Sequence, residues 1–262
     1  MNPALLVSKT GLQAQEAKLQ TIANNLANVN TVGFKRDRAV FEDLAYQVER
    51  QPGAATSGSN TLPSGLQLGT GTRVVGTQKL FTNGNLQTTG QSLDVAIVGN
   101  GFLQVNLPDG ATAYTRAGQL QVNAQGQLVN ASGLPLRPEI TIPTGATSVT
   151  IGEDGQVSAQ VGGSSGPQNL GTLQLATFVN PAGLRAQGDN LFLATEASGD
   201  PTEGDPGSAG FGNLKQGALE GSNVQAVEEM VDMIAAQRGY EMNTKVLSAA
   251  DNMMQYLAQA VR

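Results

Sequence analysis

Residues 5–33 decide how the chain folds, and they read LLVSKTGLQAQEAKLQTIANNLANVNTVG. Their large apolar residues recur with a seven-residue period, which places them on one face of a helix. That face consists of Leu5, Leu12, Leu19, Ile22, Leu26 and Val29. Pro3 suits the first turn of such a helix, and Asn30, Thr31 and Gly33 are typical of its end. The sequence therefore predicts a long N-terminal helix with a continuous apolar stripe.

A second and longer helix is predicted at the C-terminus. Ser222 and Asn223 occupy the expected N-cap, and Glu228 and Glu229 follow in the first turns, where negative charge is favourable. The residues of its apolar stripe are Val224, Val227, Val231, Ile234, Ala235, Met242, Val246, Ala250, Met253, Leu257 and Ala260. Gly239 lies inside this helix, so we expect either close packing of a neighbour or local flexibility there.

The apolar period changes from 3.6 to 2 between the two helices. Short β-prone runs alternate with Asn, Gly and Pro, and Asp109-Gly110 and Asp154-Gly155 are candidate tight turns. The runs are Val74-Val75 and residues 94–98, 102–105, 140–142, 149–151 and 173–178. Many short strands with frequent Gly indicate a barrel or sandwich of antiparallel strands.

These patterns predict the α+β class, with a discontinuous terminal α-helical coiled-coil domain enclosing a mostly antiparallel β domain. We assign residues 1–31 and 222–262 to the coiled coil, 76–206 to the β domain, and 32–75 with 207–221 to an extended linking region. Residues 51–71 and 198–212 are rich in Gly, Ser, Pro or acidic residues, and we expect neither helix nor regular strand in them.

The composition argues against an enzyme. The chain has 262 residues, no His, no Cys and no Trp, so it can supply neither a Cys/His zinc site nor a thiolate nucleophile nor a Ser-His-Asp triad. A net charge of -6 with scattered basic residues gives no footprint for nucleic acid. No apolar run reaches the roughly 20 residues that span a bilayer. We therefore expect no catalytic residues, no cofactor, no metal and no membrane insertion.

The two terminal stripes predict self-assembly into a helical homopolymer. Each apolar residue contributes roughly 1.5 to 3 kcal/mol when fully buried, so paired stripes could order the ends on contact with neighbouring subunits. Asn24, Asn25 and Asn28 lie beside the first stripe and fit two interpretations: a solvated polar edge, or amides that set the register between helices. The expected interface combines Leu5, Leu12, Leu19, Ile22, Asn24, Asn25, Leu26, Asn28, Val29, Val224, Val227, Val231, Ile234, Met242, Val246, Met253 and Leu257.

The segment from about Tyr46 to Gly71, within the linking region, has a predicted role in the stiffness of the polymer. Its Gly, Ser and Pro content is typical of a flexible linker, but apolar residues border it and lie within it, enough to dock on a neighbouring subunit. These residues are Phe41, Leu44, Tyr46, Leu62 and Leu66. Docking would make the segment a strut that resists bending.

Three sequence blocks resemble the bacterial flagellar axial proteins, the rod and hook family. They are IANNLANVNTVGFKR at residues 22–36, DVAIVGNGF at 94–102 with YTR at 114–116, and SNV at 222–224 with IAAQRGYEMN at 234–243. Because the blocks lie at both ends and in the middle, the resemblance covers essentially the whole chain. Residues 38–44, 50–53 and 62–66 are most similar to the distal rod members of the family.

The resemblance implies a structural subunit of a straight, rigid drive shaft that transmits motor torque to the hook. Its implied partners are further copies of itself, the proximal rod proteins, the hook protein, the P-ring and L-ring proteins, and the flagellar type III export apparatus. It also implies a place in the basal body, in the periplasm and across the outer-membrane ring, without a cleaved signal peptide. The N-terminus indeed lacks a basic leader.

Two alternatives remain open on the sequence. The chain could be another rod or hook-basal-body subunit, or, in a different class, a periplasmic glycan hydrolase with two carboxylates on the β scaffold. Gly99-Asn100-Gly101 is a weak phosphate-loop pattern that is better interpreted as a strand turn. Asp200, Glu203 and Asp205 lack the spacing of a calcium loop.

Overall fold

The computed structural model describes residues 3–51, 55–57, 60–61, 64–162 and 166–260. The chain divides into two compact units. The helical unit comprises Met1–Ala27, Asp37–Gln78 and Gln225–Arg262, and the β-rich unit comprises Asn28–Arg36 and Lys79–Val224. Both units are therefore discontinuous in sequence.

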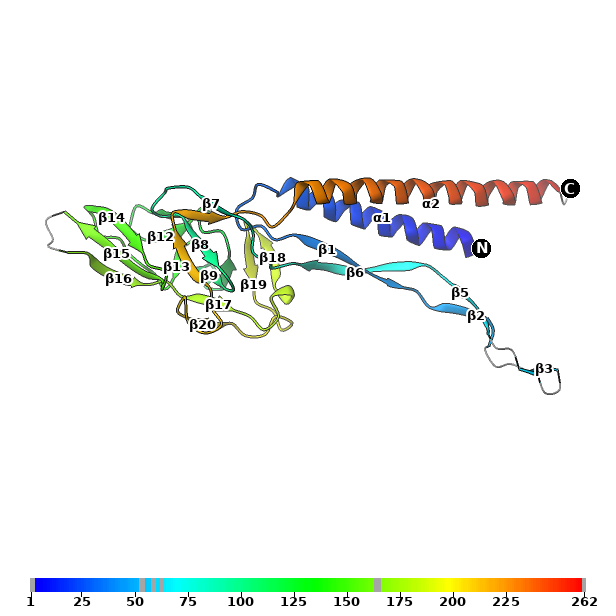
Figure 1. The fold of residues 1–262 in the computed structure, drawn as a ribbon, viewed down its shortest axis with the longest axis horizontal. Helices are drawn as coiled ribbons and strands as arrows, with labels where there is room; N and C mark the ends of the chain where they lie inside the picture. The colour runs from blue at the N-terminus through cyan, green and yellow to red at the C-terminus, as the bar shows by residue number, and fades with distance from the viewer. Residues whose placement is uncertain (1–2, 52–54, 58–59, 62–63, 163–165, 261–262) are drawn as a thin grey trace. The chain divides into compact units, whose positions relative to one another are not determined.

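The helical unit contains two long antiparallel helices, α1 (Pro3–Ala27) and α2 (Ala226–Ala260), as the sequence predicts. Figure 1 shows them side by side. Gly11 of α1 lies against Asn243 of α2, and Asn25 of α1 bonds Glu229 of α2, so the two helices run in opposite directions. Neither described helix is long and apolar enough to cross a membrane.

A long β ribbon completes the helical unit. It consists of three antiparallel pairs: β1 (Asp37–Asp43) with β6 (Thr72–Lys79), β2 (Tyr46–Arg50) with β5 (Leu66–Gly69), and β3 (Ala55–Ser57) with β4 (Asn60–Thr61). The expectation that residues 51–71 hold no regular strand is therefore wrong. The two-residue alternation of Tyr46 with Val48 and of Leu66 with Leu68 specifies strands, although Gly, Ser and Pro separate the two runs.

The β-rich unit is built around a seven-stranded antiparallel sheet in the order β18-β19-β10-β9-β17-β20, with β13 also paired to β9. Its strands are β9 (Phe102–Asn106), β10 (Thr112–Thr115), β13 (Leu136–Arg137), β17 (Leu175–Thr177), β18 (Arg185–Gly188), β19 (Leu191–Leu193) and β20 (Thr202–Gly204). A short 3-10 helix, η1 (Pro181–Gly183), precedes β18. Most of the β-prone runs that the sequence indicates are strands here.

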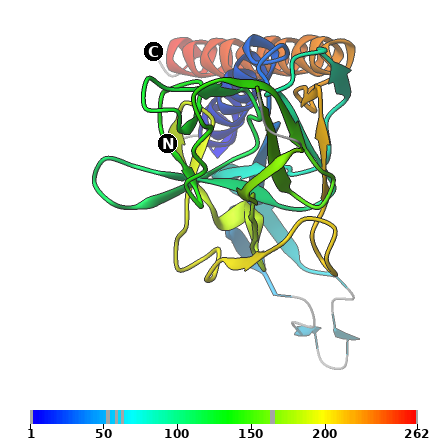
Figure 2. The same ribbon diagram turned by 90° about the vertical axis from the view of Figure 1, so that its left-hand side faces the viewer.

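Smaller antiparallel sheets pack around this one. They are β11 (Leu120–Val122) with β12 (Leu128–Asn130), β14 (Ala146–Ile151) with β15 (Gln156–Val161) and β16 (Gln168–Thr172), β8 (Val95–Val98) with β21 (Asn213–Gln216), and β7 (Leu86–Thr88) with β22 (Ala218–Glu220). Figure 2 shows these strands around a shared interior. Their inward residues, including Ile97, Leu103, Leu128, Leu175 and Leu214, form one core.

Four sequence expectations need correction. Residues 207–221 are not a linking region, because β21 and β22 pair with β8 and β7 inside the β-rich unit. Residues 198–212 contain strand β20. Residues 140–142 form only an isolated bridge, between Thr141 and Gln127, although Ile140 and Ile142 both belong to the core. Helix α2 begins at Ala226, so Ser222 and Asn223 are not its N-cap.

Candidate assembly surfaces

The contact between α1 and α2 is made of small and polar side chains rather than of the predicted apolar stripes. Ala236 and Ala250 of α2 and Ser8 and Ala14 of α1 are buried. A Cβ atom on Gly239 would lie 3.1 Å from the Gln15 side chain of α1. Close packing of a neighbour therefore accounts for the glycine inside α2, because small residues allow two helix backbones to approach.

The large apolar residues of α2 are exposed. We call this set the outer apolar face: Val227, Met230, Val231, Ile234, Met242, Val246, Met253 and Tyr256. Their exposed fractions run from 50% at Val246 to 76% at Val227. At 3.6 residues per turn, most of these positions point away from the side that holds Ala236 and Ala250, whereas Val246 and Met253 lie beside it. In the single chain, the large residues of the predicted stripe within α2 are therefore exposed over the described side chains, and Ala250 of the same stripe is buried.

The other predicted interface residues fall into three groups. Leu5, Leu12, Leu19, Leu26 and Val29 are half-buried, and Ile22 is buried. Val224 is buried in the β-rich unit, ahead of α2. Leu257 lies in α2, but its side chain is outside the described residues.

The three asparagines of the N-terminal signature have different environments. Asn25 is buried, its Nδ2 donates to the carbonyl of Asp37 at 2.9 Å, and its Oδ1 accepts from the Asp37 backbone N–H at 2.9 Å. Its Nδ2 also lies 3.3 Å from Oε1 of Glu229. Asn28 accepts from the Thr31 hydroxyl at 3.1 Å, whereas Asn24 is exposed. The Asn25 amide is thus occupied within its own chain and is not part of a solvated edge.

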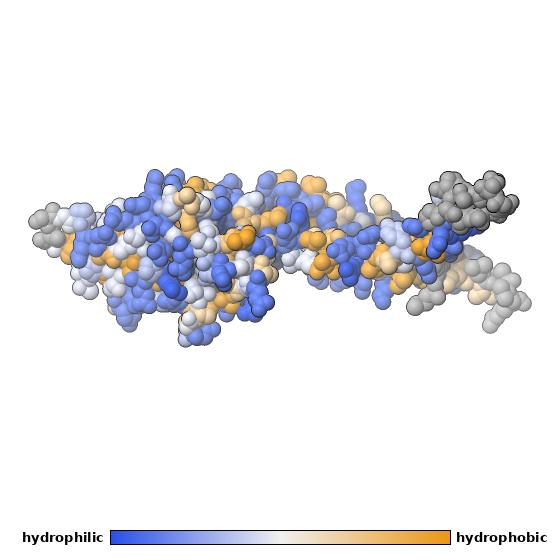
Figure 3. All heavy atoms as spheres, turned by 90° about the horizontal axis from the view of Figure 1, so that it is seen from below, coloured by the Kyte–Doolittle hydropathy of each residue, from blue (hydrophilic) through white to orange (hydrophobic). Residues whose placement is uncertain are grey.

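The ribbon presents apolar residues on both sides. Tyr46 lies opposite Gly69, and Leu68 lies opposite Gln47, so their side chains point to different faces. Phe41, Tyr46 and Leu66 are exposed, Leu44 is half-buried, and Leu62 lies outside the described residues. Figure 3, seen from the ribbon side, shows apolar side chains exposed among polar ones.

The ribbon also meets helix α1. A cavity of about 370 Å³ is lined by Leu6 of α1 and by Tyr46 and Leu68 of the ribbon, among others. The Thr10 hydroxyl of α1 accepts from the backbone N–H of Thr72 at 3.3 Å. Gly71, with φ +118, lies so close to Thr10 that no Cβ atom would fit. The root of the ribbon is therefore fixed on α1.

A buried ionic cluster in the β-rich unit was missed by the sequence reasoning. We call it the Glu220 cluster: Lys35, Arg116 and Glu220. The Lys35 ammonium lies 2.8 Å from Glu220 Oε1, and Arg116 Nη1 lies 3.2 Å from Oε2. The Gly84 backbone N–H also donates to Oε1 at 2.9 Å. The sequence held one signal that could have pointed to this cluster. Charged residues are scarce in this chain, yet these three stand among Gly or apolar residues in the sequence.

Burial dominates the electrostatics of this cluster. It lowers the pKa of Lys35, and the neighbouring Arg116 charge lowers it further, while Glu220 acts in the opposite direction. Burial likewise lowers the pKa of Arg116, again opposed by Glu220. One carboxylate thus serves two buried cations, and the remaining donors are satisfied by backbone carbonyls and Asn83. Loss of the shared carboxylate would therefore leave two buried cations without a counter-charge.

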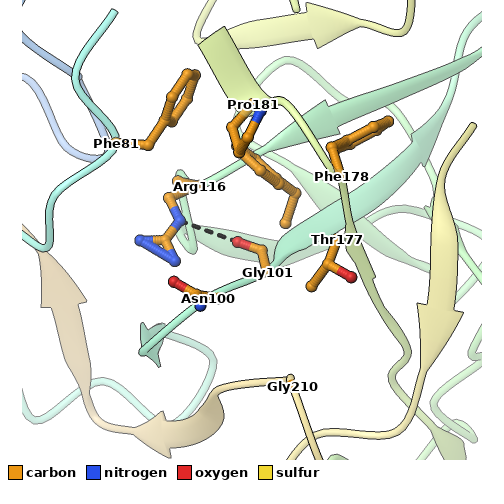
Figure 4. A pocket seen from close by; sticks show the side chains of 9 residues that line it. Phe81, Asn100, Gly101, Arg116, Thr177, Phe178, Pro181 and Gly210 are labelled. Atoms are coloured by element: carbon orange, nitrogen blue, oxygen red, sulfur yellow. Dashed lines mark hydrogen bonds between the residues drawn. The ribbon is translucent and has the colours of Figure 1, made fainter. Parts of the chain in front are cut away.

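Gly99, Asn100 and Gly101 form a turn whose carbonyl groups receive Arg116. Nε of Arg116 donates to the Gly101 carbonyl at 2.9 Å, as Figure 4 shows, and Nη2 donates to the Gly99 carbonyl. The adjoining cavity, of about 380 Å³, has aromatic walls formed by Phe81, Phe102 and Phe178. Among the described residues, no group of three carboxylate, His or Cys side chains could hold a metal ion.

Comparison with known proteins places these features in one family. Three family profiles match: "Flagella basal body rod protein" at residues 5–35, "Flagellar hook protein FlgE/F/G D1 domain" at 96–159, and "Flagellar basal body rod FlgEFG protein C-terminal" at 215–260. They cover α1 and its exit, the central β strands, and α2.

Full-length relatives agree with these profiles. The flagellar basal-body rod protein FlgG of Buchnera aphidicola subsp. Acyrthosiphon pisum (strain APS) is 54% identical over 99% of this chain and 100% of its own. The FlgG protein of Caulobacter vibrioides is 47% identical over 98% of each chain, and that of Bacillus subtilis is 38% identical over 97% of each. These relatives match along essentially the whole length of the chain, and the chain belongs to the flagellar basal-body rod protein family.

Proposed function

We propose that this chain polymerises into the distal part of the flagellar rod, a straight and rigid shaft that transmits motor torque to the hook. As a member of the rod family it is a structural subunit and not an enzyme. The single observation that carries the proposal is the outer apolar face of α2. A helix with eight large apolar residues at least half exposed is unusual in a monomer.

The outer apolar face supplies the driving force for assembly. Each of its side chains contributes roughly 1.5 to 3 kcal/mol when fully buried, and only part of the sum remains after the entropy of association is subtracted. The half-buried stripe of α1, including Leu5, Leu12 and Leu19, extends the interface. In the polymer, α1 and α2 of neighbouring subunits form a coiled-coil layer, and the amides of Asn24 and Asn28 limit slippage between helices.

The ribbon gives the polymer its stiffness. Strand pairing between β2 and β5 makes the segment an extended arm, and the exposed Phe41, Tyr46 and Leu66 allow it to dock on the next subunit. A docked arm prevents the sliding between subunits that bending requires. The competing interpretation is a passive linker, which the Gly, Ser and Pro content of residues 51–65 favours.

The remaining partners are also part of this proposal. The chain passes through the flagellar type III export apparatus and joins the proximal rod below and the hook above. It turns inside the P and L rings, in the periplasm and across the outer membrane. The large apolar residues of the terminal helices become buried only against neighbouring copies. Such helices suit a subunit that completes its folding at the tip of a growing polymer.

Complementation tests the proposal. A flagellated bacterium that lacks its own distal rod protein, supplied with this chain, should regain rods of normal length in isolated basal bodies viewed by electron microscopy. Basal bodies that stop at the proximal rod, with the chain expressed and exported, would overturn the assignment.

A further inference from the structure

The chain passes four times between its two units, after Ala27, Arg36, Gln78 and Val224. Each crossing is a covalent path along which a load on the helices is passed to the β-rich unit. Covalent bonds alone would leave each crossing free to rotate about its φ and ψ angles. The transfer of load therefore depends on the contacts that hold the segments just before and after each crossing.

On the side of the β-rich unit, one asparagine holds three of the crossing segments together. Asn223 Oδ1 accepts from the backbone N–H of Arg36 at 2.7 Å. Its Nδ2 donates to the Leu80 carbonyl at 2.8 Å and to the Thr82 hydroxyl at 2.9 Å. The Leu80 N–H in turn donates to the Arg36 carbonyl at 2.9 Å.

In the helical unit, a second asparagine, Asn25, also holds three crossing segments together. Asn25 bonds both the N–H and the carbonyl of Asp37, each at 2.9 Å, and its Nδ2 also contacts the Glu229 carboxylate in the first turns of α2. It therefore joins the last turn of α1, the first residue of β1 and the start of α2. Both asparagines act on backbone groups, which positions the main chain itself.

The two sites meet at one peptide bond in the sequence. Arg36 and Asp37 are consecutive, and their backbone N–H groups donate to Asn223 and Asn25 respectively. We propose that Asn25 and Asn223 are positioning residues that fix the crossing segments in each unit, so that torque is passed on with little backbone rotation. This proposal rests on the rod function proposed above for the torque that acts on the chain. The hydrogen bonds themselves lie within a single chain and do not depend on that function.

The chemistry requires an amide at both positions. An asparagine side chain offers an acceptor and two donors, whereas an aspartate offers acceptors alone. Asn223→Asp would keep a partner for the Arg36 N–H but would place a carboxylate against the carbonyl of Leu80. Asn25→Asp would place it against Glu229. An alanine at either position would remove both functions.

Hydrogen exchange of the full-length monomer tests the proposal directly. In Asn223→Ala, the Arg36 amide should exchange roughly ten- to a hundred-fold faster, because a buried hydrogen-bond partner is lost, while the core strand β9 should remain protected. In Asn25→Ala, the same should hold for Asp37. The matched control is Asn180→Ala, which removes a single side-chain bond to the Ala197 carbonyl at 2.9 Å, away from any crossing.

A second measurement reports on the coupling itself. The chain has no Cys, so Val179→Cys, at a position 92% exposed in the β-rich unit, and Asn252→Cys in α2 give two selective spin-label sites. The distance distribution between the labels should broaden in Asn223→Ala and Asn25→Ala and stay unchanged in Asn180→Ala. An unchanged distribution in both variants would overturn the proposal, as would a uniform rise of exchange in β9, which would reveal a general loss of stability. Because both readouts use the monomer, failure of the chain to form rods would leave this test intact.

Discussion

The Lys35 ammonium lies 2.8 Å from Oε1 of Glu220, and neither side chain is exposed to solvent. Lys35 belongs to the segment that enters the β-rich unit, and Glu220 belongs to β22 near its exit. Arg116 binds the same carboxylate from the middle of the unit. The first, middle and last parts of the β-rich unit are therefore joined at one buried charge.

Replacing Glu220 should destabilise the β-rich unit strongly. Glu220→Gln leaves two buried cations without their counter-charge, and breaking such a pair costs about 3 to 5 kcal/mol. The matched control is Glu42→Gln, which breaks the ion pair with Arg73, whose two side chains are 53% and 63% exposed. That control should cost at most about 1 kcal/mol. Urea unfolding of both variants measures the difference, and equal losses would contradict a special role for the cluster.

The boundary of the β-rich unit can be tested with fragments. A fragment of residues 28–224 retains Lys35, β21, β22 and Glu220, and it should unfold cooperatively. A fragment of residues 76–206, the β domain expected from sequence, lacks them and leaves β8 unpaired and Arg116 without its carboxylate. It should melt without a sharp transition. Equal melting curves for the two fragments would show that β21 and β22 are dispensable.

Alkaline pH should weaken the β-rich unit through Tyr114. Burial raises the pKa of Tyr114 above its ordinary 10.0, the Glu203 charge raises it further, and Arg137 opposes them. Above pH 10.0 the unfolded chain loses the tyrosine proton while the folded chain keeps it, so the free energy of unfolding falls as pH rises. The slope is at most about 1.4 kcal/mol per pH unit for one group.

Tyr114→Phe isolates this contribution. The variant lacks the hydroxyl but retains the aromatic contact with Phe178, whose ring centroid is 4.8 Å away. Its stability relative to wild type should be constant below pH 10.0 and should rise above that value. Urea unfolding at several pH values measures the difference between the two curves. Parallel curves across this range would show that Tyr114 titrates as it does in an unfolded chain.

The ribbon prediction concerns the mechanics of the polymer. Deleting residues 47–62 removes most of β2 together with β3 and β4, so β5 loses its partner strand and the arm is shortened. Export and polymerisation should continue, because the deletion leaves α1 and α2 intact, but the rods should be curved or easily bent. Electron microscopy of basal bodies from the deletion strain measures the curvature. Rods as straight as wild type would reduce the segment to a passive linker.

The sequence predicted the two helices and several of the strands, because both depend on local periodicity. The heptad of Leu5, Leu12 and Leu19 and the stripe of α2 are periodic over many turns, so α1 and α2 were found nearly to their ends. Strand β5 was missed because Gly, Ser and Pro around it resemble a linker. Its pairing with β2 is a non-local fact that composition cannot reveal.

For the candidate assembly surfaces too, features set by local spacing could be predicted, and features set by distant residues could not. The outer apolar face could be proposed from spacing, but the side of α2 that meets α1 could not. Ala236 gave no signal of its own, and Ala250 was expected on the same stripe as the large apolar residues, yet both are buried. Asn223 was expected at a helix N-cap, because Ser-Asn before a helix is typical of one, yet its partners Arg36 and Leu80 are more than a hundred residues away in sequence.

The central claim is that the outer apolar face becomes buried when the chain assembles, and a single thiol tests it most directly. Ile234→Cys places the only Cys of the chain at a position that is 52% exposed in the subunit. A maleimide should label it readily in the monomer and at least about ten-fold more slowly in isolated rods, since a buried thiol is shielded from reagent. Gln237→Cys, exposed on the same helix but outside the apolar set, controls for reactivity in the monomer. Equal labelling of Ile234→Cys in monomers and in rods would contradict the account.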